Sequence, residues 1–98
     1  MELEVVNCNI IERFFGLMFR SKKTKALLFD FKKRNKLGLH SFFVFFPFIA
    51  LWLDEENNVL ELRKVKPWKL FVGPNNSFFK ILEIPVNKRY KTIIDKLI

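Results

Sequence analysis

The first apolar positions of the chain predict a short strand followed by a short helix. Residues 2–6 alternate polar and apolar side chains and end in two valines, a pattern typical of a strand. Asn9 offers a helix cap, and Glu12 stands three residues later as in a capping box. The helix is expected to end near Gly16 and to bury a stripe at helical spacing. That stripe is Ile10, Ile11, Phe14, Phe15 and Met18.

The next apolar segment predicts a second strand between two basic loops. Residues 26–31 alternate so that one face of the strand is apolar. That face carries Leu27, Phe29 and Phe31. Residues 21–25 and 32–36 are rich in lysine and are predicted to be exposed loops.

The middle of the chain predicts three more strands. Residues 41–46 form a dense aromatic run that suits a buried strand. Pro47 is expected to end it, because proline cannot donate to a central ladder. Residues 49–53 and 59–65 flank the polar loop 54–58, and this arrangement predicts a β-hairpin.

The end of the chain predicts a strand and a closing helix. Residues 73–76 are typical of a turn, and residues 78–84 alternate up to Pro85. Asn87 is a suitable cap for the helix that follows. The apolar stripe of that helix is Tyr90, Ile93, Ile94 and Leu97.

Together these elements predict one α+β domain over residues 1–98. The expected architecture is a small, mostly antiparallel, twisted sheet or a partly closed barrel. A short helix in the N-terminal region and a C-terminal helix would pack against it. A chain of 98 residues is long enough for one core.

Composition narrows the class of protein. The chain is 50% hydrophobic and 29% charged, which excludes an extended disordered protein. A single cysteine, Cys8, excludes a disulfide scaffold and a zinc site built on paired cysteines. The chain carries no G-x-S-x-G nucleophile motif. We therefore predict no metal and no cofactor, and a binding protein rather than an enzyme.

The net charge is +8, and residues 20–36 carry most of it. One interpretation is a solvated basic surface without a specific role. The alternative is a nucleic-acid-binding module that uses this basic zone together with exposed aromatic rings. Its cations would be Lys22, Lys23, Lys25, Lys32, Lys33 and Arg34. Its stacking rings would come from Phe42, Phe43, Phe45, Phe46, Phe48, Trp52 and Trp68.

The apolar stretches bear on localisation. The chain opens with Glu2 and Glu4 rather than with a basic segment before an apolar one, so we expect no signal peptide. The longest apolar stretch, residues 42–53, is interrupted by Pro47 and is shorter than the ~20 residues of a spanning helix. The expectation is a soluble, cytoplasmic protein without membrane insertion.

Several short motifs resemble one known family. Residues 13–20, Arg-Phe-Phe-Gly-Leu-Met-Phe-Arg, resemble the R-x-x-G-L-M-x-R opening of the domain of unknown function 192 (DUF192) family. The resemblance continues, in the family's order, through residues 40–47, 51–54, 66–68 and 82–85. It implies a short, archaeal-type member with a small mixed α/β fold and no established activity. Bacterial members carry a polar patch where this chain has Val-Phe-Phe-Pro at 44–47.

Six residues are candidates for ligand binding. Arg13 and Arg20 could hold a carboxylate or phosphate between them. The others are His40, Trp52, Trp68 and Glu83. Alternation places Glu83 opposite its apolar neighbours and so predicts an exposed carboxylate. Were Glu83 buried, Arg13 would be the cation expected to neutralise it.

The function predicted from these observations is a small binding module without catalytic activity. Its partner would be a small anionic ligand or a protein, bound in an aromatic cleft edged by the two arginines and His40. Nucleic-acid binding is the alternative. Further alternatives are an enzyme built around His40, Ser41 and Glu83, and self-association through an exposed phenylalanine patch. The acids Asp54, Glu55 and Glu56 are expected to cap a loop.

Overall fold

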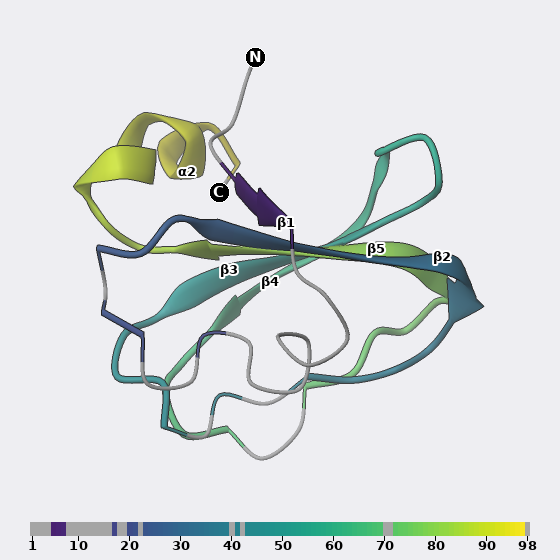
Figure 1. Ribbon diagram of the computed structural model, residues 1–98, viewed down its shortest axis with the longest axis horizontal. Coiled ribbons are helices and arrows are strands. Elements are labelled where there is room, and N and C mark those ends of the chain that lie inside the picture. Colours follow the sequence, from purple (N-terminus) through teal and green to yellow (C-terminus); the bar gives the residue numbers. More distant parts are fainter. Residues whose placement is uncertain are drawn as a thin grey trace.

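The protein folds as a five-stranded sheet with a helical segment at its C-terminal end (Figure 1). The computed structural model describes residues 5–7, 17, 20–21, 23–39, 41, 43–69 and 72–97. The strands are β1 (Val5–Asn7), β2 (Ala26–Asn35), β3 (Phe48–Leu53), β4 (Val59–Val65) and β5 (Phe78–Pro85). A 3₁₀ turn, η1 (Lys88–Tyr90), leads into the helix α2 (Lys91–Leu97).

The sheet is open, with the strand order β1-β2-β5-β3-β4. Strand β1 runs parallel to β2, and every other neighbouring pair is antiparallel. The prediction of a mostly antiparallel sheet is therefore confirmed. The prediction of a partly closed barrel is wrong, because β1 and β4 lie at opposite edges of the sheet and do not pair.

Each face of the sheet is covered by a different part of the chain. On the loop face, Phe29, Phe48 and Trp52 pack with Val44 and Phe46 from the connecting loops. On the helix face, Ile49, Leu82 and Ile84 pack with Tyr90 and Ile94. Figure 1 shows α2 on one side of the sheet and the loops on the other. All six residues of β3 are buried, because this strand is covered on both faces.

The closing helix begins as predicted. The side chain of Asn87 accepts a hydrogen bond from the backbone N–H of Tyr90, at 3.2 Å. Tyr90 and Ile94 are buried against the sheet, which confirms the predicted stripe. Of the other predicted helix, near residues 10–18, only Leu17 lies among the described residues. No described helix is long and apolar enough to cross a membrane.

The prediction of a strand at residues 41–46 is wrong. The backbone N–H of Val44 donates to the carbonyl of Ser41, and Phe43 has a φ of 56°. These groups form a turn, so they cannot extend a ladder. The strand instead begins after Pro47, at Phe48.

Strand β2 is longer than the alternation of residues 26–31 indicated. It continues through the predicted basic loop to Asn35, with an irregularity in its pairing between Asp30 and Asn35. Lys32 has a φ of 58°, and its N–H donates to a carboxylate oxygen of Asp30 at 2.9 Å. Lys32, Lys33 and Arg34 therefore lie on an irregular strand end rather than in a loop.

The β3–β4 hairpin is confirmed. One carboxylate oxygen of Asp54 accepts hydrogen bonds from the N–H groups of Glu56 and Asn58, at 2.9 and 2.8 Å. The other accepts one from the side-chain amide of Asn58, at 3.0 Å. These hydrogen bonds, those with Asn58 above all, hold the pKa of Asp54 below its ordinary value. Of the three acidic residues expected to cap this loop, Asp54 does so.

Candidate functional site

The most unusual surface feature is a group of three aromatic side chains, Phe43, Phe45 and Trp68, which we call the aromatic patch. They are 41%, 62% and 46% exposed. The Phe43 and Trp68 ring centroids lie 4.9 Å apart with planes inclined by 61°, and those of Phe45 and Trp68 lie 5.5 Å apart at 77°. Edge-to-face contacts of this kind are favourable, so the rings form one cluster. The patch is a coherent apolar surface rather than scattered side chains.

Ser41 builds the patch by joining its two loop segments. Its hydroxyl donates to the carbonyl of Lys66 and accepts from the N–H of Lys69, both at 2.6 Å. Its carbonyl accepts from the N–H of Trp68 at 2.8 Å. Ser41 is fully buried, so these bonds are shielded from water. They set the turns at residues 41–44 and 66–69 against each other.

Both turns carry an aromatic residue in the left-handed region. Phe43 has a φ of 56° and Trp68 a φ of 63°. This conformation costs a residue with a Cβ about 1–2 kcal/mol, and it is rare for bulky side chains. The chain therefore holds two large rings at the surface in a backbone conformation that glycine would adopt more readily. Strain of this kind is a common property of binding sites.

The charge around the patch is positive. Lys66 and Lys69 flank Trp68 in the sequence, and both are exposed. Residues 41–47 and 66–69 contain no acidic side chain. The patch therefore combines exposed rings with a local excess of positive charge.

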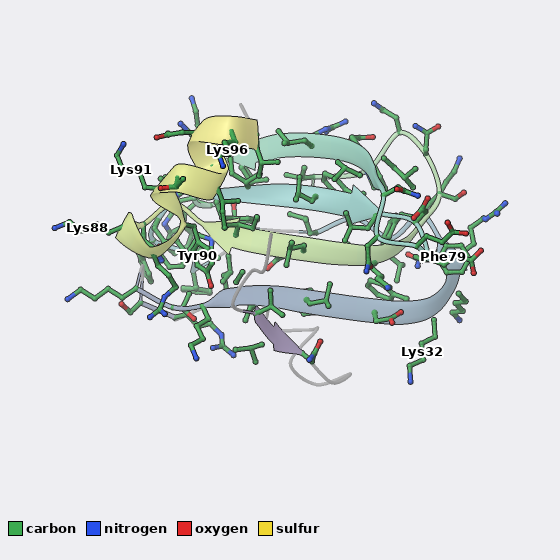
Figure 2. The ribbon with its side chains drawn as sticks, turned by 90° about the horizontal axis from the view of Figure 1, so that it is seen from above. Lys32, Phe79, Lys88, Tyr90, Lys91 and Lys96 are labelled. Atoms are coloured by element: carbon green, nitrogen blue, oxygen red, sulfur yellow. The ribbon has the colours of Figure 1, made fainter. Side chains whose placement is uncertain are left out.

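The predicted basic zone does not form one surface. Lys23 and Lys25 precede β2, whereas Lys32, Lys33 and Arg34 occupy its far end, and roughly 20 Å of strand separates the two groups. Figure 2 shows Lys32 beside Phe79 at one end of the molecule, with Lys88 and Lys91 at the other. The guanidinium of Arg34 lies over the Phe79 ring, 5.9 Å from its centroid. Lys22 lies outside the described residues.

The structure separates the predicted ligand-binding residues. Trp68 is exposed, but Trp52 is fully buried on the loop face and cannot line a surface cleft with it. Arg20 is half-buried. Arg13 and His40 lie outside the described residues.

The prediction that Glu83 is exposed is wrong, because the residue is only 6% exposed. Glu83 lies between Leu27 of β2 and Ala50 of β3 in the sheet register, so it projects onto the loop face with them. Alternation placed it correctly opposite Leu82 and Ile84, but the loops cover that face too. Burial raises the pKa of Glu83 to about 8, so its neutral form predominates at neutral pH.

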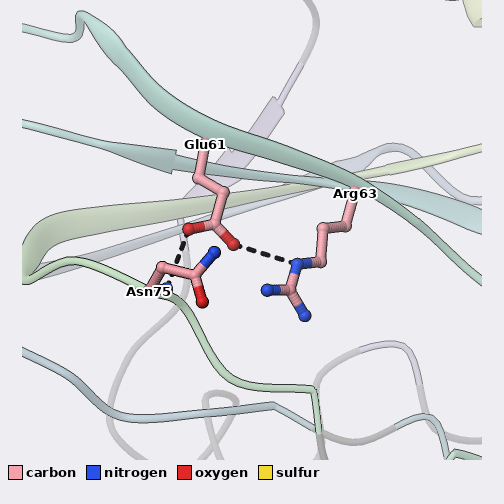
Figure 3. Close-up of polar contacts among 3 residues, drawn as sticks. All are labelled: Glu61, Arg63 and Asn75. Atoms are coloured by element: carbon pink, nitrogen blue, oxygen red, sulfur yellow. Dashed lines mark hydrogen bonds and ion pairs between the residues drawn. The ribbon is translucent and has the colours of Figure 1, made fainter.

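A second polar group lies on β4 at the edge of the loop face (Figure 3). A carboxylate oxygen of Glu61 lies 2.9 Å from the Nε of Arg63. The other oxygen accepts the backbone N–H of Asn75 at 2.8 Å. The Arg63 guanidinium lies 6.0 Å from the centroid of the Trp52 ring. These contacts tie the loop at residue 75 to the sheet and cover Trp52.

Of the predicted catalytic group, the structure describes Ser41 and Glu83, and His40 lies outside the described residues. The hydroxyl of Ser41 is used in two hydrogen bonds to backbone atoms, so it is committed to holding the loops. Among the described residues, no three histidine, cysteine, aspartate or glutamate side chains cluster as metal ligands would.

The role of Ser41 in the aromatic patch was not predictable from the sequence. The sequence indicated Phe43 and Phe45 as no more than two of seven candidate rings. Five of these rings lie between residues 42 and 48. The alternation of buried Val44 and Phe46 with exposed Phe43 and Phe45 is visible in that run once its register is known.

Comparison with known proteins identifies relatives without an assigned activity. A model of the DUF192 family, described as "Uncharacterized ACR", matches residues 1–95. A UPF0127 protein from Pyrococcus abyssi is 32% identical over 83 residues, which are 83% of this chain and 69% of that protein. A UPF0127 protein from Thermococcus gammatolerans is 32% identical over 78 residues, or 78% of this chain and 50% of that protein. The chain thus spans only about half of some relatives.

Two solved structures share the fold. One is a candidate transcription regulator from Sinorhizobium meliloti, with a TM-score of 0.76 and 17% identity, covering 93% of this chain and 72% of that one. The other is a protein of unknown function from Novosphingobium aromaticivorans, with a TM-score of 0.73 and 15% identity, covering 92% of this chain and 66% of that one. At these identities the likeness concerns the fold alone.

Proposed function

The chain belongs to the DUF192 family, and from this premise we propose that it is a binding module without catalytic activity whose contact surface is the aromatic patch. The partner class that this surface fits best is single-stranded nucleic acid. The observation that carries the proposal is the exposure of three clustered rings on two turns with a positive φ.

The energetics of the patch favour a binding role over a folding role. A ring contributes to folding mainly by leaving water, and Phe45 leaves 62% of its surface in water. The positive φ at Phe43 and Trp68 adds a backbone cost. A partner that covers the rings would bury more of their apolar surface.

The charge around the patch favours an anionic partner. Lys66 and Lys69 stand beside Trp68, and neither loop segment holds an acid. A second copy of the chain carries the same net charge of +8 and the same two lysines beside its patch, so electrostatic repulsion disfavours self-association. A cationic partner is disfavoured for the same reason.

Single-stranded nucleic acid meets both requirements. Its bases have open faces that stack on aromatic side chains, and its phosphates pair with lysines. Base–aromatic stacking contributes about 1–3 kcal/mol per base. In a duplex the bases are stacked inside, so the rings could not reach their faces. The candidate transcription regulator that shares the fold is compatible with this class but does not establish it.

The experiment is a fluorescence-anisotropy titration with a labelled single-stranded 12-mer, made as RNA and as DNA, and with the matched duplex. We expect the single strands to bind more tightly than the duplex, with an affinity that falls steeply between about 50 and 200 mM salt. Phe45→Ala and Trp68→Ala should each weaken binding about 5- to 150-fold. Lys69→Ala should reduce the slope of log affinity against log salt concentration by about one, as expected for the loss of one phosphate contact.

The matched control is Leu60→Ala, which removes another exposed apolar side chain, 43% exposed, from β4. It should leave the affinity unchanged. Equal binding of the duplex, or unchanged binding by both aromatic variants, would refute the proposal. Binding of the wild type to anionic lipid vesicles in place of oligonucleotides, lost in Phe45→Ala, would assign the patch to a membrane surface instead.

A further inference from the structure

Strand β4 forms one edge of the open sheet. It pairs with β3 on one side, and no described strand pairs with its other side. An irregularity in the pairing with β3, between Trp52 and Leu53, marks the N-terminal limit of the regular strand. Residues 60–64, which we call the β4 edge, therefore present main-chain N–H and C=O groups that another strand can pair with.

The side chains of the β4 edge differ between its two faces. Leu62 packs with the cluster of the helix face, and Leu60 is 43% exposed. Glu61 and Arg63 lie on the loop face, where the side chain of Arg63 is 38% exposed (Figure 3). A guanidinium has several N–H donors, and the ion pair with Glu61 is made through Nε. Arg63 can therefore contact a second carboxylate as well.

The sequence of the β4 edge is complementary to itself in antiparallel pairing. When two copies pair around a two-fold axis at Leu62, the two Leu62 side chains face each other. Glu61 of each copy then stands opposite Arg63 of the other copy. Such opposite residues have Cβ atoms about 4.5–5.5 Å apart, and opposite charges in these positions stabilise the pairing. Leu60 stands opposite Lys64, whose methylene stem can cover the exposed leucine.

The other registers are less favourable. An axis at Glu61, Arg63 or Lys64 would place two like charges directly opposite each other, which is destabilising. An axis between two residues would pair a side chain of the loop face with one of the helix face, which the alternation of a continuous sheet does not allow. Charged residues on an edge strand commonly prevent pairing. In the register centred on Leu62 they favour it.

We infer that the chain forms a two-fold dimer in which the β4 edges of two copies pair in antiparallel, with Leu62 at the axis. The two five-stranded sheets then form one continuous sheet. The partner is a second copy because the charge pattern of the edge matches its own reverse. The inference stands apart from the proposed function, because the β4 edge contains none of the residues of the aromatic patch.

The net charge of the chain limits the strength of this dimer. In a contact between two patches the lysines would repel one another, whereas the β4 edges bring opposite charges together. The remaining repulsion between two chains of net charge +8 is largely screened beyond about 8 Å at physiological ionic strength. Residues 60–64 are few compared with the roughly 20–30 residues a side of a standard interface. We therefore expect a reversible dimer with a dissociation constant of about 10 μM to 1 mM.

The test is analytical ultracentrifugation of the full chain in about 150 mM salt, over the concentration range that brackets this constant. The wild type should change from the mass of one chain to that of two as its concentration rises. Arg63→Glu opposes two glutamates and Glu61→Arg opposes two arginines, so each variant alone should dimerise at least about tenfold more weakly. Far-UV circular dichroism shows whether each variant is folded.

Mixing the two variants tests the register itself. In a mixed dimer the glutamates of Arg63→Glu stand opposite the arginines of Glu61→Arg at both positions, so the mixture should recover the wild-type affinity to within about threefold. The double variant Glu61→Arg/Arg63→Glu retains opposite charges within the strand and across the axis. It should dimerise like the wild type, and it provides the test if either single variant does not fold.

The matched control is Lys33→Glu, which changes the net charge by the same two units at an exposed position of β2. It should not weaken dimerisation by more than about twofold. Hydrogen exchange measured by NMR at low and high concentration locates the contact. Exchange should slow within residues 60–64 as the dimer forms, and it should not change in β1 at the opposite edge.

Three results would overturn the inference. They are a chain that stays monomeric up to about 1 mM, a dimer that is unaffected by Arg63→Glu and Glu61→Arg, and folded single variants whose mixture does not dimerise. Phe45→Ala should weaken oligonucleotide binding and leave dimerisation unchanged, so the proposed function and this inference can fail separately. Loss of the dimer in Phe45→Ala would place the contact at the aromatic patch and would also refute the β4 edge.

Discussion

Phe45 and Phe46 are neighbours in the sequence, yet their surroundings are opposite. Phe46 is 4% exposed and packs in the core of the loop face, whereas Phe45 is 62% exposed in the aromatic patch. The side chains are identical, so the difference in their roles comes from position alone. A ring in the core stabilises the fold by leaving water, and a ring in the patch remains available to a partner. The comparison separates a ring that stabilises the fold from a ring that the proposed function assigns to contact with a partner.

The largest expected effect is the contrast between these two phenylalanines. Phe46→Ala should lower the free energy of unfolding by about 3–5 kcal/mol, because it leaves a cavity under the loops. Phe45→Ala should change it by no more than about 0.5 kcal/mol. Urea unfolding followed by far-UV circular dichroism measures both. Similar losses for the two variants would show that the patch belongs to the core.

Glu83 sharpens the comparison, since it is an ionisable group on the loop face. Burial raises its pKa from an ordinary value of 4.5 to about 8, so the folded state binds the proton more tightly than the unfolded state does. The stabilisation from protonated Glu83 is fully present below pH 4.5 and is lost as the pH rises towards 8. The free energy of unfolding should fall by at most about 1.4 kcal/mol per pH unit in this window.

Urea unfolding of Glu83→Gln across the same pH range tests this expectation. The amide cannot ionise, so this part of the pH dependence should disappear. Glu56→Gln, at an exposed turn position, is the control and should keep the wild-type slope. A wild-type slope in Glu83→Gln would mean that other groups cause the pH dependence.

Ser41 links the two regions, because it is buried itself and positions the exposed rings. Ser41→Ala leaves the carbonyl of Lys66 and the N–H of Lys69 without their hydroxyl partner. We expect a loss of about 1–3 kcal/mol in the free energy of unfolding, with weaker oligonucleotide binding. Ser21→Ala, which removes an exposed hydroxyl that accepts the N–H of Lys23, should cost no more than about 0.5 kcal/mol. Binding by Ser41→Ala at wild-type strength would show that the patch does not depend on this link.

Local patterns predicted much of the sheet. The hairpin of residues 49–65 and the Asn87 cap depend on contacts between residues close in the sequence. The strand that ends at Pro85 was indicated by its own alternation and by the proline. The family could be recognised because its short motifs occur in order over most of the chain. The prediction of a strand at 41–46 failed because a dense run of aromatic residues also fits a turn, and the deciding hydrogen bonds come from residues 66–69.

The candidate sites depended on contacts that sequence spacing does not contain. Alternation correctly set Glu83 apart from Leu82 and Ile84, but exposure depended on whether another part of the chain covers that face. Lys23 lies close to Lys88 and Arg89 because the strands that they flank, β2 and β5, are paired in the sheet.

The amino-acid sequence by itself determined the local elements, the hydrophobic faces of the strands and the positive net charge, because these follow from the order of side chains along the chain. The tertiary structure alone decided which aromatic rings are exposed, which carboxyl group is buried and which cations lie close together. Those outcomes depend on long-range packing, in which segments as far apart as residues 24 and 87 meet through hydrogen bonds.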